Sequence, residues 1–217
     1  MQTYLVMGLC VLLLITLMAM IVRCNRKTGP TSTVIFGDGG KTTTETFLDG
    51  RPDINVMLLT PNSYSRPQTS TDKITGIVIH YTANPGSGAQ ANRDYFEGLK
   101  DSHETSASSH FIVGLEGEVI QCIPTSEVAY ASNGRNHDTV SIEVCHPDET
   151  GKFNDATYSS LVQLTGWLCE YLGVTPDDVI RHYDVTGKLC PKYFVEHEDA
   201  WEQFVEDVRT WVKNNGG

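Results

Sequence analysis

The feature that most constrains the fold is a short apolar run that contains a histidine near its end. Residues 77–81 read Ile-Val-Ile-His-Tyr, and the run is almost continuously apolar. It lacks the alternation of a half-exposed strand, so it predicts a central strand that is buried on both faces. Such a strand belongs in a sheet that is covered by helices. We therefore expect strands and helices to alternate along the chain.

Further strands follow from apolar runs and turn residues. Residues 111–114 and 118–123 are predicted to form two strands around Glu116-Gly117, which is a hairpin signal. Another strand is expected at residues 139–145. Together with the helices described next, these strands predict an α/β fold with a mixed central β-sheet flanked by helices.

Three helices are expected from apolar residues at helical spacing. The first covers residues 89–99, the second runs over 155–172 with Asp155 as its cap and Gly173 at its end, and the third lies near the C-terminus. The residues expected to face the core are Ala91, Tyr95, Phe96 and Leu99, then Leu161, Leu164, Leu168 and Tyr171, then Trp201, Phe204, Val205, Val208, Trp211 and Val212.

An uninterrupted apolar run also lies near the N-terminus, at residues 4–22. As a helix it would rise roughly 28 Å, which is close to the thickness of the hydrocarbon core of a bilayer. No cation precedes the run and no small-residue cleavage site follows it, so an uncleaved anchor is favoured over a cleaved signal peptide. Residues 1–27 are predicted to be a transmembrane anchor or signal segment, 28–54 a flexible linker, and 55–217 the folded domain.

The stretch at residues 181–191 carries the groups best suited to chemistry. It offers the imidazole of His182, the thiol of Cys190 and the cation of Lys188, and Gly187 allows a tight turn between them. Histidine and cysteine together suit zinc, which takes nitrogen and sulfur ligands. His80 is the best candidate for a third ligand. Three protein ligands leave one position open for water, as in a catalytic rather than a structural zinc site.

Each of these residues also has a structural interpretation. A histidine at a strand end is more often a hydrogen-bonded residue than a ligand, and Cys190 alone would be a buried thiol. That is the state we expect for the other cysteines of the domain, Cys122, Cys145 and Cys169. A cysteine hydrolase with Cys190 as nucleophile and His182 as base is a further possibility, but it leaves His80 without a role.

The ordered set of motifs resembles the type 2 N-acetylmuramoyl-L-alanine amidases, zinc enzymes that share a fold with the peptidoglycan recognition proteins. The resemblance runs from about residue 55 to the last helix. It is carried by Val78-Ile79-His80-Tyr81-Thr82, Ser109-His110-Phe111, Ser141-Ile142-Glu143, and His182 followed by Lys188-Leu189-Cys190-Pro191. In that family two histidines and a Cys or Asp bind zinc, which implies Zn²⁺ as the cofactor and His80, His182 and Cys190 as its ligands.

The resemblance also implies the roles of the remaining residues. Zinc can lower the pKa of bound water towards about 7 and polarise a carbonyl group. Glu143 could take a proton from that water and pass it to the leaving amine, and Lys188 could stabilise the oxyanion. His110 and Tyr81 are predicted to bind substrate. A hydrogen-bonded core histidine and a packing tyrosine stay open as alternatives for these two. Four more histidines, His103, His137, His146 and His197, are expected to be exposed and have no assigned role.

The implied function is cleavage of the amide bond between N-acetylmuramic acid and L-alanine in the stem peptide of peptidoglycan. The alternative is a non-catalytic peptidoglycan-binding module on the same fold, although such relatives typically lose the cysteine ligand that this chain keeps. Residues 128–132 depart from the family, because many members have Trp and His there, and this affects substrate detail. The net charge of −11 argues against a nucleic-acid partner. A monomer is expected.

The expected location rests on two conflicting signals. A peptidoglycan substrate favours a single-pass protein of the cell membrane with its catalytic domain outside the cytoplasm, or alternatively a secreted protein. In contrast, Arg23, Arg26 and Lys27 follow the apolar run, and the positive-inside rule would keep them and the domain in the cytoplasm.

Overall fold

The apolar run that contains His80 forms a buried central strand. In the computed structural model, which describes residues 50–216, this strand is β2 (Gly76–Tyr81), buried from its first residue to His80. It lies between β5 (Thr139–Val144) and β6 (Val179–Arg181) and runs parallel to both. The strand order of the six-stranded sheet is β1-β4-β3-β5-β2-β6.

The other half of the sheet contains the predicted hairpin. β3 (Phe111–Val113) and β4 (Val119–Gln121) are antiparallel, and β3 joins β5 in parallel. β1 (Ile54–Val56) forms the edge of the sheet and is parallel to β4. The predicted α/β fold with a mixed central sheet is therefore confirmed.

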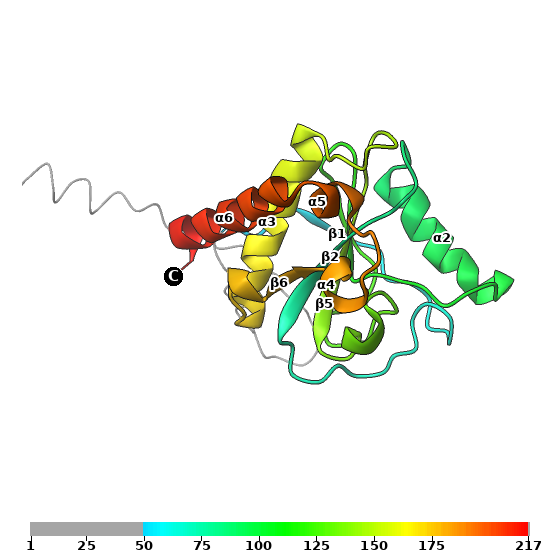
Figure 1. Ribbon diagram of the computed structural model, residues 1–217. Coiled ribbons are helices and arrows are strands. Elements are labelled where there is room, and N and C mark those ends of the chain that lie inside the picture. The colour runs from blue at the N-terminus through cyan, green and yellow to red at the C-terminus, as the bar shows by residue number, and fades with distance from the viewer. Residues whose placement is uncertain (1–49, 217) are drawn as a thin grey trace, which may run out of the picture. The chain divides into compact units, whose positions relative to one another are not determined.

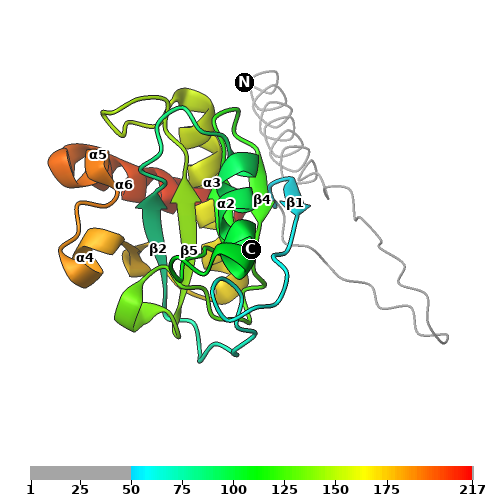
Figure 2. The same ribbon diagram turned by 90° about the vertical axis from the view of Figure 1, so that its right-hand side faces the viewer.

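Helices cover both faces of this sheet, as Figures 1 and 2 show. α2 (Ala89–Ser102) packs on one face, while α3 (Asp155–Leu172) and α6 (Glu198–Asn215) pack on the other. Ile77 and Ile79 belong to the core on the α3 and α6 side. Because successive side chains of a strand point to opposite faces, His80 is directed to the α2 side of the sheet.

The predicted helices are present, but parts of their buried faces differ from the prediction. Ala91, Tyr95 and Tyr171 are exposed, the two tyrosines at 49% and 55%, although all three were expected in the core. On α2 the buried position is instead Asn92, whose amide donates to the carbonyl oxygen of Gly88 at 2.9 Å. A polar residue can occupy this position because its hydrogen bonds are satisfied locally.

The sequence did not predict several short elements. α4 (His182–Thr186) and α5 (Lys192–Glu196) are helices of five residues, and η1 (Asn133–Arg135) and η2 (Pro176–Asp178) are single 3₁₀ turns. β1 and β6 have three residues each. Elements this short contain too few positions for apolar periodicity to be recognised.

The membrane location expected from the sequence is corrected here. Within residues 50–216, no helix is both long and apolar enough to cross a bilayer. The longest helices described, α3 and α6, have 18 residues each, and α6 exposes charged side chains such as Glu202 and Arg209. The run at residues 4–22, the predicted transmembrane helix, lies outside the described residues. The absence of a membrane-spanning helix from residues 50–216 contradicts the predicted location in the cell membrane.

The contact between α3 and α6 gives a testable prediction about stability. A Cβ atom added at Gly166 would lie 2.8 Å from Cδ2 of Trp211, so the indole would have to move. We expect Gly166→Ala to lower the free energy of unfolding, measured by urea denaturation, by about 1–3 kcal/mol. Gly98 on α2 is the matched control, because a Cβ there meets nothing within 4 Å. Gly98→Ala should raise stability by about 0.5–1 kcal/mol, and equal stabilities of the two variants would contradict the packing argument.

Candidate metal centre and active site

Three neighbouring parallel strands bring the candidate site together at their carboxyl ends. β2 supplies His80, β5 supplies Glu143, and β6 leads directly into α4, whose first residue is His182. His80 and Glu143 are paired in register, so their side chains project from the same face of the sheet. Carboxyl ends of parallel strands are the usual place for ligand sites in such sheets.

The His80 side chain is 2% exposed and lies between several polar groups. Its Nδ1 atom is 3.8 Å from Sγ of Cys190 and 4.0 Å from Oε1 of Glu143, while its Nε2 atom is 3.2 Å from Oγ of Ser132. The ring centroid of His182 is 4.6 Å away. Burial, and then the charges of His182 and neighbouring groups, holds the pKa of His80 well below its usual range. The imidazole is therefore neutral, as a metal ligand must be.

The position of His182 is fixed by the residue before it. The guanidinium of Arg181 donates to Asp184 at 3.0 Å and to Glu198 at 2.6 Å, which anchors the first turn of α4. Nε2 of His182 is 3.0 Å from Oδ1 of Asn133, whereas Nδ1 is buried and has no hydrogen-bond partner. Burial, assisted by Lys188, lowers the pKa of His182. This ring therefore offers an unused lone pair inside the site.

A tight turn after α4 places Cys190 next to His80 in the site. Gly187 ends this helix at φ +75°, in the left-handed region that favours glycine, and the N–H of Tyr183 donates to the carbonyl oxygen of Cys190 at 2.9 Å. Burial, followed by the nearby Glu143 carboxylate, raises the pKa of the Cys190 thiol to about 12, and a hydrogen bond from the backbone of Tyr81 opposes that shift.

These three side chains fit a metal ion. One ligand atom from each of His80, His182 and Cys190 lies within 4.8 Å of the others, and all three residues are buried. The unpartnered Nδ1 atom of His182 supports this interpretation, because a buried polar atom without a hydrogen bond is costly unless something else binds it. Two imidazoles and a thiolate form a donor set that borderline-soft metal ions prefer.

Two ionisable groups adjoin the candidate metal site. Burial raises the pKa of Glu143 to about 8, against the opposing effect of Lys188, and its Oε2 atom is buried without a hydrogen bond. Lys188 is exposed and lies on the turn between α4 and Cys190. Its charge acts on both histidines, on Glu143 and on Cys190.

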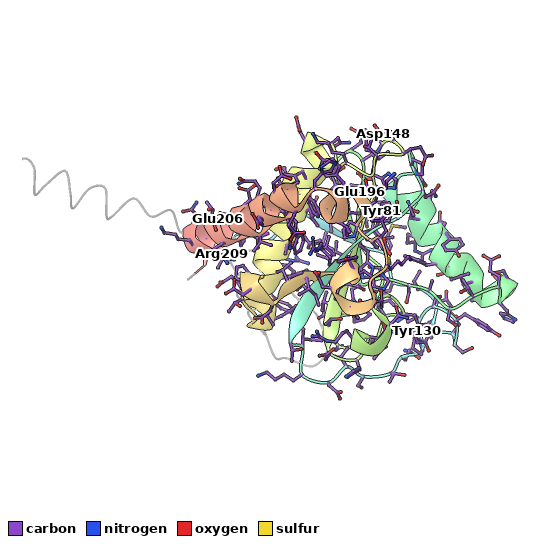
Figure 3. All side chains as sticks on the ribbon, viewed as in Figure 1. Tyr81, Tyr130, Asp148, Glu196, Glu206 and Arg209 are labelled. Carbon is purple, nitrogen blue, oxygen red and sulfur yellow. The ribbon has the colours of Figure 1, made fainter. Side chains whose placement is uncertain are left out.

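The site opens into a cavity of about 360 Å³. This volume is within the range of small-molecule sites, which begins at about 300 Å³. Tyr81 and Tyr130, two of its lining residues, are labelled in Figure 3. Beside these and the three candidate ligands, the lining includes Phe96, Ser106, Ala107, Ser108, Ala131, Asn133, Asn136, Glu143 and Lys188.

Comparison with known proteins assigns the family. The family model described as N-acetylmuramoyl-L-alanine amidase matches residues 70–193, more than half of the chain, and this range contains His80, Glu143, His182, Lys188 and Cys190. The chain belongs to the type 2 N-acetylmuramoyl-L-alanine amidase family. The predicted family resemblance is therefore confirmed.

Individual relatives agree with this assignment. N-acetylmuramoyl-L-alanine amidase CwlL of Bacillus licheniformis is 32% identical over 166 residues, which cover 70% of this chain and 46% of the relative. A probable N-acetylmuramoyl-L-alanine amidase of the same organism is 34% identical over 159 residues, or 68% of this chain and 44% of the relative. The chain thus spans less than half the length of these two relatives. The solved structure of PlyL shares the fold, with a TM-score of 0.64 and 23% identity over 74% of this chain and 99% of PlyL.

In this amidase domain, His110 lies apart from the cavity lining. It is 1% exposed, and its Nδ1 atom accepts a hydrogen bond from the N–H of Ser141 at 3.0 Å. Its Nε2 atom therefore carries the proton and donates to the carbonyl oxygen of Glu127 at 2.9 Å. Burial lowers the pKa of His110 to about 4, so the ring is neutral. These contacts connect β3, β5 and the loop that contains Glu127.

The structure also describes several residues whose burial or contacts the sequence predicted differently or did not predict. His146, which was expected to be exposed, is buried, and its Nδ1 atom is 2.7 Å from the carbonyl oxygen of Asp148. Cys122, Cys145 and Cys169 are buried free thiols, as predicted. Ser132 and Asn133, which contact the two histidines, had no assigned role. An Asn-Gly pair such as Asn133-Gly134 favours a turn, but it does not indicate which side chain the turn approaches.

Proposed function

We propose that this domain is a zinc-dependent hydrolase that cleaves the amide bond between N-acetylmuramic acid and L-alanine of the peptidoglycan stem peptide. The main support is the convergence of His80, His182 and Cys190 with Glu143 at one open cavity. The relatives named N-acetylmuramoyl-L-alanine amidases support the choice of substrate.

Zinc is the proposed metal because two imidazoles and one thiolate suit it and leave a fourth position open. When bound, it supplies a Lewis acid that polarises the substrate carbonyl and lowers the pKa of water. His80 and His182 would hold it through Nδ1, since the Nε2 atom of each ring already faces another side chain. Cys190 would hold it as a thiolate.

Glu143 is proposed to move the proton. Its carboxylate lies beside His80 and has a buried oxygen without a partner, so it can accept a proton from water as the water oxygen bonds to the lactyl carbonyl carbon. Its raised pKa of about 8 makes both the carboxylate that accepts the proton and the carboxylic acid that donates it accessible near neutral pH. The same group then donates the proton to the nitrogen of L-alanine as the C–N bond breaks. One water is consumed, and a carboxylic acid and an amine are formed.

Lys188 is proposed to stabilise the negative oxygen of the tetrahedral intermediate. It lines the cavity, and its ammonium group acts electrostatically on both Glu143 and the candidate ligands. A cation fixed near a developing oxyanion lowers the barrier because it interacts more strongly with the transition state than with the substrate.

A cysteine hydrolase is less compatible with the site. Burial raises the pKa of the Cys190 thiol to about 12, so without a metal the group is a thiol rather than a nucleophilic thiolate.

Digestion of purified peptidoglycan by the purified chain tests the proposed function. We expect new N-terminal L-alanine and no new reducing sugar ends. Removal of metal with 1,10-phenanthroline should abolish release, and about one equivalent of zinc should restore it. A chain that binds zinc and peptidoglycan without releasing any ends would instead be a binding module, and new reducing ends would indicate a glycosidase.

Lys188→Ala should lower kcat by about 10²–10³, the usual effect of removing one group that stabilises an oxyanion. Zinc content should not change, because Lys188 is not among the candidate ligands. Lys192→Ala is the matched control, since Lys192 donates to the carbonyl oxygen of Glu149 and does not line the cavity. Equal kcat values for both variants would remove Lys188 from the mechanism.

A further inference from the structure

One loop contacts both candidate histidine ligands on the side away from the metal position. Ser132 and Asn133 are consecutive, and Oγ of Ser132 is 3.2 Å from Nε2 of His80, while Oδ1 of Asn133 is 3.0 Å from Nε2 of His182. The two imidazoles come from different elements, β2 and α4. A single loop therefore fixes the relative orientation of two rings that the sequence separates widely.

The contact with Asn133 determines which nitrogen of His182 carries the proton. A carboxamide oxygen only accepts hydrogen bonds, so Nε2 of His182 must donate and hold the proton. An imidazole that binds a metal is neutral, so with the proton on Nε2 its lone pair is on Nδ1, and this is the buried atom without a partner. Asn133 thus selects the tautomer in which the metal-facing nitrogen is free to bind.

Ser132 contacts the corresponding nitrogen of the other ring. Ser132 is only 1% exposed, and its hydroxyl oxygen can accept a hydrogen bond from the N–H at Nε2 of His80. That leaves Nδ1 of His80 available on the side of Cys190, 3.8 Å from its sulfur.

The loop is held in place independently of the two histidines. The side-chain oxygen of Asn136 accepts hydrogen bonds from the backbone N–H groups of Ala131 at 3.1 Å and Ser132 at 2.5 Å. Asn133 has φ +51°, a left-handed conformation that asparagine tolerates better than most residues. The hydroxyl of Thr139 donates to the carbonyl oxygen of Arg135 at 2.6 Å and so connects the loop to β5.

We propose that Asn133 and Ser132 are positioning residues that hold both imidazoles in the Nδ1-binding tautomer and orientation. They raise metal affinity without touching the metal, by removing the cost of selecting tautomer and ring rotation when the ion binds. The proposal rests on the metal centre described under the proposed function. It also gives a role to Ser132, the last residue of the segment 128–132, in which the sequence departs from many family members.

Zinc affinity of purified variants, measured by competition with a chromophoric chelator, tests this proposal. Asn133→Gly removes the acceptor and keeps a residue that suits φ +51°, so we expect roughly 10–100-fold weaker zinc binding with an unchanged urea midpoint of the metal-free chain. Asn133→Asp keeps an acceptor at the same place and should bind zinc at least as tightly as the wild type. Ser132→Ala should weaken zinc binding roughly 10-fold.

Asn62→Ala is the matched control for a structural asparagine. Asn62 also organises a turn, by accepting hydrogen bonds from the N–H groups of Tyr64 and Ser65, but it does not line the cavity. This variant should lose stability and keep the wild-type zinc affinity.

The tautomer of His182 provides a second measurement that needs no metal. The ¹⁵N chemical shifts of the ring should show the Nε2–H tautomer in the metal-free wild type and a mixture of tautomers in Asn133→Gly. Wild-type affinity and an unchanged tautomer in Asn133→Gly would overturn the role of Asn133. Failure of the wild type itself to bind zinc would instead overturn the metal centre, so the two failures can be distinguished.

Discussion

Replacing Glu143 with alanine or glutamine is expected to lower kcat by about 10²–10⁴, which is the usual contribution of a positioned general acid–base group. Both variants should fold, because the Oε2 atom of Glu143 makes no hydrogen bond whose loss would destabilise the domain. They should also keep zinc, since the carboxylate is proposed to move protons and not to hold the metal. The measurements are single-turnover hydrolysis of a muropeptide and zinc content by atomic absorption.

Two outcomes would change the mechanism. Loss of zinc in Glu143→Gln would mean that the carboxylate binds the metal or orients one of its ligands. Unchanged turnover with zinc retained would mean that another group is the base. The double variant of Glu143 and Lys188 should lose less activity than the product of the two single effects, because both residues act on one tetrahedral intermediate.

Replacing Cys190 with alanine is expected to abolish zinc binding and hydrolysis together. Two imidazoles cannot hold the ion at high affinity, and the thiolate charge that partly neutralises the metal is lost. The fall in zinc affinity should exceed the roughly 10–100-fold effects of residues that only orient ligands. Zinc affinity is measured on the metal-free protein by chelator competition.

Two further cysteine variants test whether the loss of zinc binding is specific to the removal of a ligand at position 190. Cys190→Asp should recover part of the affinity, because a carboxylate oxygen also binds zinc. Cys122→Ala removes another buried free thiol and should leave zinc binding unchanged, since Cys122 lies in the core on the α2 side and outside the candidate ligand set. Full zinc content in Cys190→Ala would show that Cys190 is not a ligand.

The predictions from sequence succeeded where the signal was local. The apolar run at residues 77–81 is the central strand β2, the hairpin around Glu116-Gly117 is present, and Gly173 ends α3 in the left-handed conformation. Strand and helix periodicities depend on neighbouring residues, so they can be read without knowledge of the fold. The prediction of Asp155 as the cap of α3 was one residue away from the observed cap, Asn154, which accepts from the N–H of Thr157.

Several of the predictions that failed concern burial. Tyr95 was expected in the core and is exposed, and His146 was expected to be exposed and is buried. Tyr95 adjoins Phe96 in the sequence, and the direction in which α2 packs decided which of the two rings is buried. His146 lies in a polar stretch, but its backbone partner at Asp148 and the ring of Tyr81 enclose it.

The sequence by itself determined the fold class, the family and the types of residue available for chemistry. The tertiary structure decided which atoms of those residues face one another. Nδ1 of His80 lies next to the sulfur of Cys190, which is 110 positions away in the sequence. Nε2 of His80 lies next to Ser132, 52 positions away, and Nε2 of His182 lies next to Asn133, 49 positions away. Ring orientation, tautomer and the burial that raises the pKa of Glu143 to about 8 all arise from such distant contacts, and a local pattern of residue types does not contain them.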